Sequence, residues 1–391
     1  MQAHWREGNR FVLLPEGQRY LPVLFEAIDQ AEHSILLELY AFDEGELAER
    51  FITALTRAAE RGVIVLLLLD GAGAWGMSSQ SQQRLLNAGV ALRYFNPLTA
   101  KRLLSVKRLT SLKRLRTSIS RDHRKILIVD GQVAFTGGFG AMDYFLNGWF
   151  EVAVRIEGPC VNDWIALFHS VWASRLSQGC GDPALMQRVI NRVRETAVES
   201  HMNGRVIWGG GYRYQAIRRS LHHRINTAQR RVWLCTPYFA PTLSLRRLLV
   251  RAARRGVDVR LLLPSDVHHD HPTVRYAGQR FYARLLRGGV RIYEYQPDFI
   301  HAKFAICDDW STVGSCNFDH WSLQWNLEAN QEVDNAEFSH ELAVIFERNF
   351  AKSYEISSLV WEQRPYWQRI REWCFGTLDA LITRLLSLIH I

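Results

Sequence analysis

Two short motifs in this chain carry residues that could do phosphodiester chemistry. Each has the pattern His-x-Lys-x-x-x-x-Asp: the motif residues are His123, Lys125 and Asp130 in the first copy and His301, Lys303 and Asp308 in the second. Imidazole titrates near neutral pH, so it can serve as a nucleophile or as an acid and base. A lysine ammonium can hold the oxygens of a phosphate. The motifs therefore predict phosphodiester transfer through a covalent intermediate, with no metal and no cofactor.

Each motif lies in a short apolar run that is typical of a buried strand. Residues two apart on a strand face the same side, so each histidine should project together with its lysine. Each aspartate lies an odd number of residues further on, and we expect it to do a structural task although it belongs to the motif. One copy alone could be an ordinary strand with a surface lysine. The second copy, again followed by a glycine turn, argues against that interpretation.

The motifs lie in two halves with echoing sequences. Residues 57–63 end a predicted helix before the apolar run 64–69, and residues 251–257 do the same before 259–263. Alternating helices and strands predict an α/β fold in each half, with a pseudo-twofold axis that brings both motifs to one cleft. We expect a first half over 1–200, a second over 201–356 and a tail over 357–391.

The two halves differ directly before the motif histidine. Three residues separate Pro297 from His301, whereas twenty-five separate Pro97 from His123. The extra segment, 98–122, is basic and repeats Lys-Arg-Leu, with Lys101, Arg102, Lys107, Arg108, Lys113 and Arg114. It could be a mobile, solvated charge run. Its position favours a cationic lip over the cleft that meets anionic lipid headgroups.

Composition narrows the partners but does not choose among them. The 391 residues carry a formal charge of +9, which favours nucleic acid or an acidic membrane. The six cysteines are scattered without a C-x-x-C pair, as in a reducing compartment, and neither a signal peptide nor a bilayer-spanning stretch is evident. The segment Ser265–His271 is rich in histidine and aspartate, but its spacing matches no metal site.

The C-terminal tail mixes aromatic residues with arginine from Trp361 to Trp373. Beyond it, Leu381, Ile382, Leu385, Leu388 and Ile389 recur at helical spacing. Such a helix could pack on the protein body or on another subunit. It could also lie in the plane of a membrane with its tryptophans at headgroup level.

The paired motifs resemble those of the phospholipase D superfamily, and the resemblance extends over about Trp5 to Phe350. Within it, four segments resemble bacterial cardiolipin synthases of the short type without N-terminal membrane helices: Trp5–Asn9, Glu151–Pro159, Thr236–Pro241 and Ser322–Asn330. The resemblance implies a phosphatidyltransferase that joins two phosphatidylglycerol molecules and releases glycerol. It also implies peripheral binding to the cytoplasmic side of the bacterial inner membrane.

The resemblance further implies a role for each site residue. His123 would be the nucleophile and His301 the acid and base, although the sequence is symmetric enough to allow the reverse. Lys125, Lys303, Ser315 and Asn317 would hold phosphate oxygens. Glu151 and Glu328 would each orient an imidazole and stabilise its cationic form, as the carboxylate of a catalytic triad does.

One position departs from the family pattern. The second half has Asn317 three residues after the first glycine of its turn, but the first half has Gly140. The second half should therefore carry most of the phosphate anchoring. Three alternatives stay open: a phospholipase D-type hydrolase or transphosphatidylase on other lipids, a nuclease of the same superfamily, and a non-catalytic membrane protein.

Overall fold

The computed structural model describes residues 3–97, 120–182, 184–193, 198–210, 214–265, 272–324 and 326–388. Most of the basic segment 98–122 and most of the histidine-rich segment 265–271 lie outside these residues. So do the side chains from position 378 onward, and with them the predicted apolar positions from Leu381 to Ile389.

The first half is an eight-stranded mixed sheet in the order β9-β4-β3-β2-β5-β6-β8-β1, in which only β2, β3 and β4 run parallel. Its strands are β1 (Arg6–Pro15), β2 (Ser34–Leu39), β3 (Ile64–Asp70), β4 (Ala91–Phe95), β5 (Ile126–Val129), β6 (Val133–Gly137), β8 (Val152–Glu157) and β9 (Ser177–Gly179). Its helices are α1 (Gly17–Asp29), α2 (Glu46–Glu60), α3 (Ser79–Asn87), α6 (Cys160–Trp172) and α7 (Ala184–Arg192), with a 3-10 turn η1 (Asp143–Phe145).

The second half repeats this order as β19-β14-β13-β12-β16-β17-β18-β10, with β11 added beside β10. Its strands are β10 (Met202–Gly210), β11 (Tyr214–Gln215), β12 (Arg231–Cys235), β13 (Asp258–Pro264), β14 (Arg291–Tyr295), β16 (Phe304–Cys307), β17 (Trp310–Gly314), β18 (Leu327–Asp334) and β19 (Ser353–Glu355). Its helices are α8 (Ala216–Thr227), α9 (Leu243–Arg254), α10 (Pro272–Gln279), α11 (Tyr282–Arg287), α12 (His320–Gln324), α13 (Ala336–Phe350), α14 (Ser358–Glu362) and α15 (Tyr366–Leu388).

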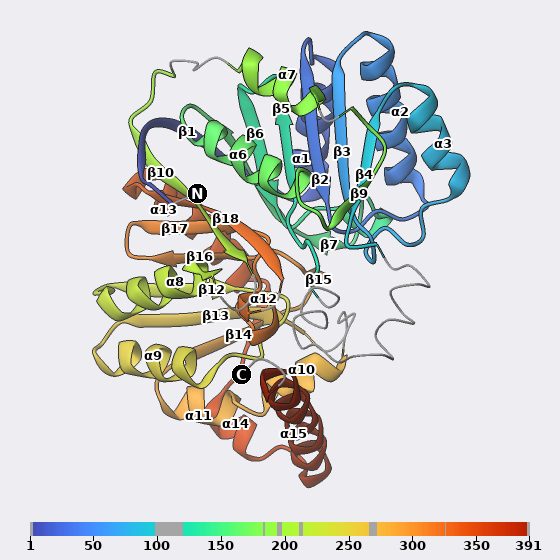
Figure 1. The fold of residues 1–391 in the computed structure, drawn as a ribbon. Coiled ribbons are helices and arrows are strands. Elements are labelled where there is room, and N and C mark those ends of the chain that lie inside the picture. Colours follow the sequence, from blue (N-terminus) through green and yellow to red (C-terminus); the bar gives the residue numbers. More distant parts are fainter. Residues whose placement is uncertain are drawn as a thin grey trace.

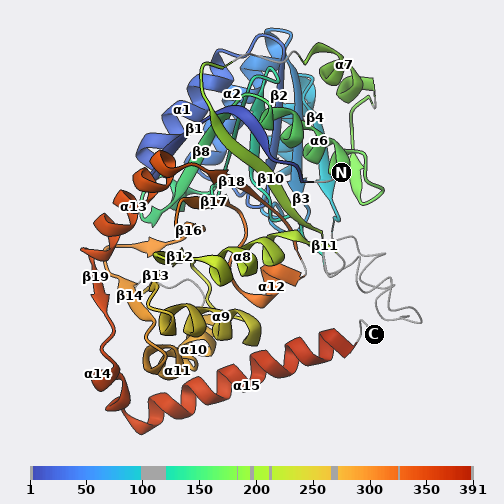
Figure 2. The same ribbon diagram turned by 90° about the vertical axis from the view of Figure 1, so that its left-hand side faces the viewer.

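Matching strand orders confirm the predicted duplicated α/β fold. Strand β1 pairs with β10, so the two sheets form one continuous 17-stranded sheet (Figure 1). Helix α6 of the first half contacts β10, and α13 of the second half contacts β1, so these two helices lie where the halves meet. Helices α1 to α3 and α8, α9 and α11 cover the outer faces (Figures 1 and 2).

The central strands are apolar throughout because both of their faces are buried. In β2, Leu36 belongs to the core between the halves, whereas Ile35 and Leu37 belong to the core under the outer helices. Strand alternation thus sends neighbouring residues into two different cores. The predicted glycine stops also hold, since Gly62 and Gly256 adopt φ of 89° and 91° after α2 and α9.

Helix α15 covers the predicted helical segment as far as Leu388 but begins earlier, at Tyr366, and it packs against α10. Among the residues that the structure describes, no helix combines the length and the apolar character needed to cross a bilayer.

Candidate active site

Both motif histidines precede the predicted strands instead of lying within them. Strand β5 begins at Ile126, directly after Lys125, and β16 begins at Phe304, directly after Lys303. Each histidine and lysine therefore stands in an extended lead-in at the edge of its sheet. The backbone of each lead-in segment forms hydrogen bonds with the opposite half of the molecule.

The lead-in of His123 is bound to the second half. The backbone N–H of His123 donates to the Leu327 carbonyl over 2.9 Å, and the Leu327 N–H donates to the Arg121 carbonyl over 2.9 Å. The next residue along the second-half chain is Glu328. The backbone pairing therefore sets a second-half glutamate directly beside a first-half histidine.

The lead-in of His301 is bound to the first half in the same way. A two-stranded parallel sheet joins β15 (Phe299–Ile300) to β7 (Trp149–Phe150), and the His301 N–H donates to the Phe150 carbonyl over 2.9 Å. The next residue along the first-half chain is Glu151. The duplication therefore produces two reciprocal histidine–glutamate pairs, each built from both halves.

The carboxylates set the orientation of the two imidazole rings. Nδ1 of His123 lies 2.9 Å from Oε1 of Glu328, and Nδ1 of His301 lies 2.7 Å from Oε2 of Glu151. A proton on Nδ1 is shared with the carboxylate, so Nε2 carries the lone pair that could attack phosphorus or accept a proton. Both glutamates are fully buried, while both histidine side chains keep a small exposed area.

The lysines approach the two histidines differently. Nζ of Lys303 lies 2.8 Å from Nδ1 and 2.9 Å from Nε2 of His301, and it also contacts the His301 carbonyl. Nζ of Lys125 donates to the carbonyl of His123 and lies 5.3 Å from the ring centre of Tyr40. The imidazole of His301 thus has an ammonium group on its ring, whereas that of His123 does not.

Burial and the two ammonium groups control the protonation of the cluster. Burial, followed by the charges of Lys125 and Lys303, holds the pKa of both His123 and His301 well below the usual range. Burial also lowers the pKa of Lys125 to about 7 and raises the pKa of Glu328 to about 8, and it raises the pKa of Glu151. The groups of one half shift those of the other, so both motifs share one site.

Ser315 and Asn317 lie on the buried turn that follows β17, which is the glycine turn of the second half. The Ser315 hydroxyl donates to Oε2 of Glu328 over 2.5 Å, so it supports the partner of His123. The Asn317 amide nitrogen donates to the Ser322 hydroxyl over 3.2 Å, while its buried carbonyl oxygen has no partner among the described residues. The phosphate-binding role of both residues stays a prediction.

Asp130 and Asp308 lie in the turns after β5 and β16, at the far ends of these strands from the histidines. Asp130 accepts hydrogen bonds from the backbone N–H groups of 32, 33 and 34 over 2.7–3.0 Å. Asp308 accepts them from 229, 230 and 231 over 2.9–3.1 Å. Both adopt positive φ near 55° and anchor the start of β2 or β12, as expected of a structural residue.

The aromatic side chains that pack on the two histidine rings were not predicted, and Tyr40 and Trp149 approach them most closely. Tyr40 packs edge-on against the His123 ring with 4.9 Å between ring centres, and Trp149 lies 4.7 Å from the His301 ring. Trp149 lies two residues before Glu151, so in an extended chain the two side chains point to the same side. This alternation could have predicted that Trp149 lies at the site. Tyr40 directly follows β2, at the sheet edge where the motif lead-ins also lie.

Comparison with known proteins agrees with this geometry. A family model described as "Cardiolipin synthase, PLD-like domain" matches residues 24–172 and 221–350. The chain is 35% identical over 350 residues to cardiolipin synthase B of Salmonella typhimurium, covering 88% of this chain and 80% of that protein. It is 30% identical over 385 residues to cardiolipin synthase A of Pectobacterium atrosepticum, covering 96% and 76%.

The fold is shared with a solved phosphatidylserine synthase from Haemophilus influenzae, at a TM-score of 0.72 and 12% identity over 95% of this chain and 94% of that one. Fold and paired motifs define an enzyme of the phospholipase D superfamily, a phosphatidyltransferase. Within that superfamily, this chain belongs to the cardiolipin synthase family.

Proposed function

We propose that this enzyme transfers a phosphatidyl group from one phosphatidylglycerol molecule to another, giving cardiolipin and glycerol. The observation that carries the proposal is the pair of reciprocal histidine–glutamate contacts, each supplied by both halves, with a lysine beside each histidine. Similarity to cardiolipin synthases A and B supports the choice of lipid. The proposal places the enzyme peripherally on the cytoplasmic face of the bacterial inner membrane.

In the first step, Nε2 of His123 attacks phosphorus, and the bond from phosphorus to the glycerol oxygen breaks. His301, protonated in the substrate complex, gives its proton to that oxygen and glycerol leaves. The phosphatidyl-imidazolium at His123 is cationic, and Glu328 stabilises it through Nδ1. The ammonium groups of Lys125 and Lys303 offset the charge on the phosphate oxygens.

In the second step, neutral His301 takes the proton from a hydroxyl of the second phosphatidylglycerol. The oxygen attacks phosphorus, the phosphorus–nitrogen bond breaks, and the electron pair returns to His123. The lysine contacts favour His123 as the nucleophile. Nζ of Lys303 lies within 2.9 Å of both ring nitrogens of His301 and would hinder their attack on phosphorus, whereas Lys125 contacts the carbonyl of His123.

The test incubates purified protein with phosphatidylglycerol vesicles and quantifies lipids and free glycerol by mass spectrometry. The expected products are cardiolipin and glycerol in equal amounts. Phosphatidate as the dominant product would show that water is the acceptor and the enzyme is a hydrolase. Cleavage of an oligonucleotide with no lipid turnover would identify a nuclease instead.

A further inference from the structure

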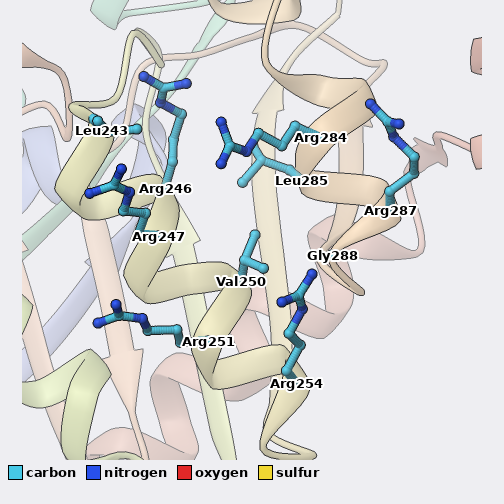
Figure 3. Close-up of a pocket in the computed structure, with 10 residues that line it drawn as sticks. All are labelled: Leu243, Arg246, Arg247, Val250, Arg251, Arg254, Arg284, Leu285, Arg287 and Gly288. Atoms are coloured by element: carbon cyan, nitrogen blue, oxygen red, sulfur yellow. The ribbon is translucent and has the colours of Figure 1, made fainter.

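A groove rich in arginine lies on the outer face of the second half, away from the histidines. It runs between α9 and α11 and encloses about 580 Å³ (Figure 3). Figure 3 shows Arg284 reaching from α11 towards α9. The arginines that line the groove are Arg246, Arg247, Arg251, Arg254, Arg284 and Arg287. A few apolar groups, Val250 and Leu285 among them, complete its wall.

No acidic side chain lines this groove among the residues that the structure describes. Helices α9 and α11 contain no aspartate or glutamate, and within the described parts of the chain none of the six arginines forms an ion pair. Burial, together with the nearby charges of Arg284, Arg280 and Arg247, lowers the pKa of Arg246. Such a concentration of like charge is stabilised when an external anion binds, and guanidinium groups match phosphate oxygens in pairs.

At the same end of the second half, α14 and α15 display apolar side chains to solvent. Tyr366, Ile370 and Trp373 are 77%, 48% and 60% exposed, and their spacing puts them on one stripe of α15. Leu359 and Val360 of α14 are exposed as well. Figures 1 and 2 show α9, α11, α14 and α15 together at the end of the second half furthest from the first half.

The orientation of α15 is fixed by the contacts of its opposite side. Phe375 packs against Tyr276 of α10 with 5.6 Å between ring centres, and the Arg371 guanidinium lies 3.7 Å from the same ring. The buried carboxylate of Glu372 accepts from Arg364 over 2.9 Å. The apolar stripe is therefore held outward by the packing of the helix.

We propose that the arginine groove and the apolar stripe of α15, at the same end of the second half, form a docking surface for an anionic phospholipid bilayer. Lipid phosphates would enter the groove, and the aromatic side chains would lie at headgroup depth. A bilayer fits both features at once, because nucleic acid would neutralise the arginines but leave the apolar stripe in water. The inference rests on the proposed function only in that the substrate is a lipid.

The test compares two variants that lose the same charge from exposed positions. The groove variant combines Arg247→Gln, Arg251→Gln, Arg284→Gln and Arg287→Gln. The control variant, in the first half, combines Arg19→Gln, Arg50→Gln, Arg57→Gln and Arg192→Gln. Sedimentation with vesicles of phosphatidylglycerol and phosphatidylcholine measures binding, with His123→Ala present in all proteins so that no lipid is consumed.

The groove variant should bind at least tenfold more weakly, because each surface arginine near an anionic bilayer contributes roughly fivefold. The control variant should stay within about threefold. A third variant, Ile370→Ser with Trp373→Ser, should lose the binding that persists at high salt. In proteins that retain His123, all three sets should leave turnover of dihexanoyl-phosphatidylglycerol, a soluble substrate, unchanged.

Equal losses in the groove and control variants would overturn the proposal, since net charge alone would then explain binding. Unchanged vesicle binding in the groove variant would also overturn it, and so would loss of binding to a single-stranded oligonucleotide with vesicle binding intact. A failure of the proposed function is separate, because it would appear as wrong lipid products while vesicle binding follows the expected order.

Discussion

The two glutamates of the active site do the same task in different surroundings. Glu328 accepts a hydrogen bond from the hydroxyl of Ser315 over 2.5 Å. The residue that matches Ser315 in the first half is Gly138. A Cβ added at Gly138 would come within 2.2 Å of Oε2 of Glu151. The carboxylate of the first half therefore occupies the space that a side chain takes in the second half. A duplicated fold can keep its histidine–glutamate pairs while the support behind each pair diverges.

The turn after β6, which contains Gly140, and the turn after β17, which contains Asn317, differ in a second way. Asn317 fits its turn, but a Cβ at Gly140 would lie 2.9 Å from the Phe145 ring and 3.1 Å from the Ala41 carbonyl. Gly140 is not one of the described glycines that have a positive φ. Steric crowding, and not backbone strain, therefore excludes a larger residue at this position. The first half cannot accept the family asparagine without moving Phe145.

The largest effect should separate the two histidines. His123→Ala and His301→Ala should each lower transfer from phosphatidylglycerol by at least roughly 10⁴-fold, since the two residues act as a unit. A phosphatidyl ester of p-nitrophenol needs no proton on its leaving group. With it, His301→Ala should release one equivalent of p-nitrophenol in a burst and retain a covalent lipid that intact-mass spectrometry detects, whereas His123→Ala should do neither.

The control for this experiment is Asp308→Asn, which alters the motif at a carboxylate that accepts hydrogen bonds from three backbone N–H groups far from the histidines. It should keep most activity at 25 °C and lower the melting temperature by a few degrees. A burst in His123→Ala and none in His301→Ala would reverse the assigned roles, and the contact of Lys303 with the His301 ring would then need another explanation.

The next effect tests whether the two glutamates serve the histidines of opposite halves. Glu328→Gln and Glu151→Gln should each reduce kcat by about 10²- to 10⁴-fold, because the amide cannot stabilise a cationic imidazole. Glu328→Gln should add little to the loss in His123→Ala, and Glu151→Gln should add little to that in His301→Ala. Pairing within one half predicts the opposite combinations, which the same double-mutant cycles would reveal.

Sequence reasoning reached the duplicated α/β fold and could name candidate site residues, because both depend on patterns within short stretches of the chain. Strand runs, glycine stops and the repeated motif need only short stretches of chain. The exchange of glutamates could not be read in this way, because it depends on backbone pairing between Leu327 and His123, which are far apart in sequence. The same reason hid the contact of Tyr40 with His123.

The asymmetry of the turns should give a smaller effect. Asn317→Ala should lower kcat/KM roughly ten- to a hundredfold if its buried amide bonds a charged phosphate oxygen. Gly140→Asn should not raise activity, because the new side chain would meet Phe145. Steady-state kinetics on the soluble dihexanoyl lipid would measure both. A silent Asn317→Ala with a crippling Gly140→Ala would move the phosphate anchoring to the first half.

The smallest effect is the pH dependence, and its direction follows from Lys125. The pKa of this buried lysine is lowered to about 7, so the free enzyme loses the ammonium charge as the pH rises through that value. The pKa of His123 lies well below its usual range, so the nucleophile stays neutral when the pH falls through 6.5. We therefore expect kcat/KM to decline above about pH 7, by up to tenfold per pH unit, and not to fall on the acid side, where His301, whose pKa is also lowered, gains the proton that it donates to glycerol. Lys125→Arg, whose charge persists, should lose activity overall but flatten the alkaline decline.

A profile that instead rises through pH 7 in the native enzyme would show that the rate depends on removing a proton from this cluster, and that the charge of Lys125 does not limit substrate capture.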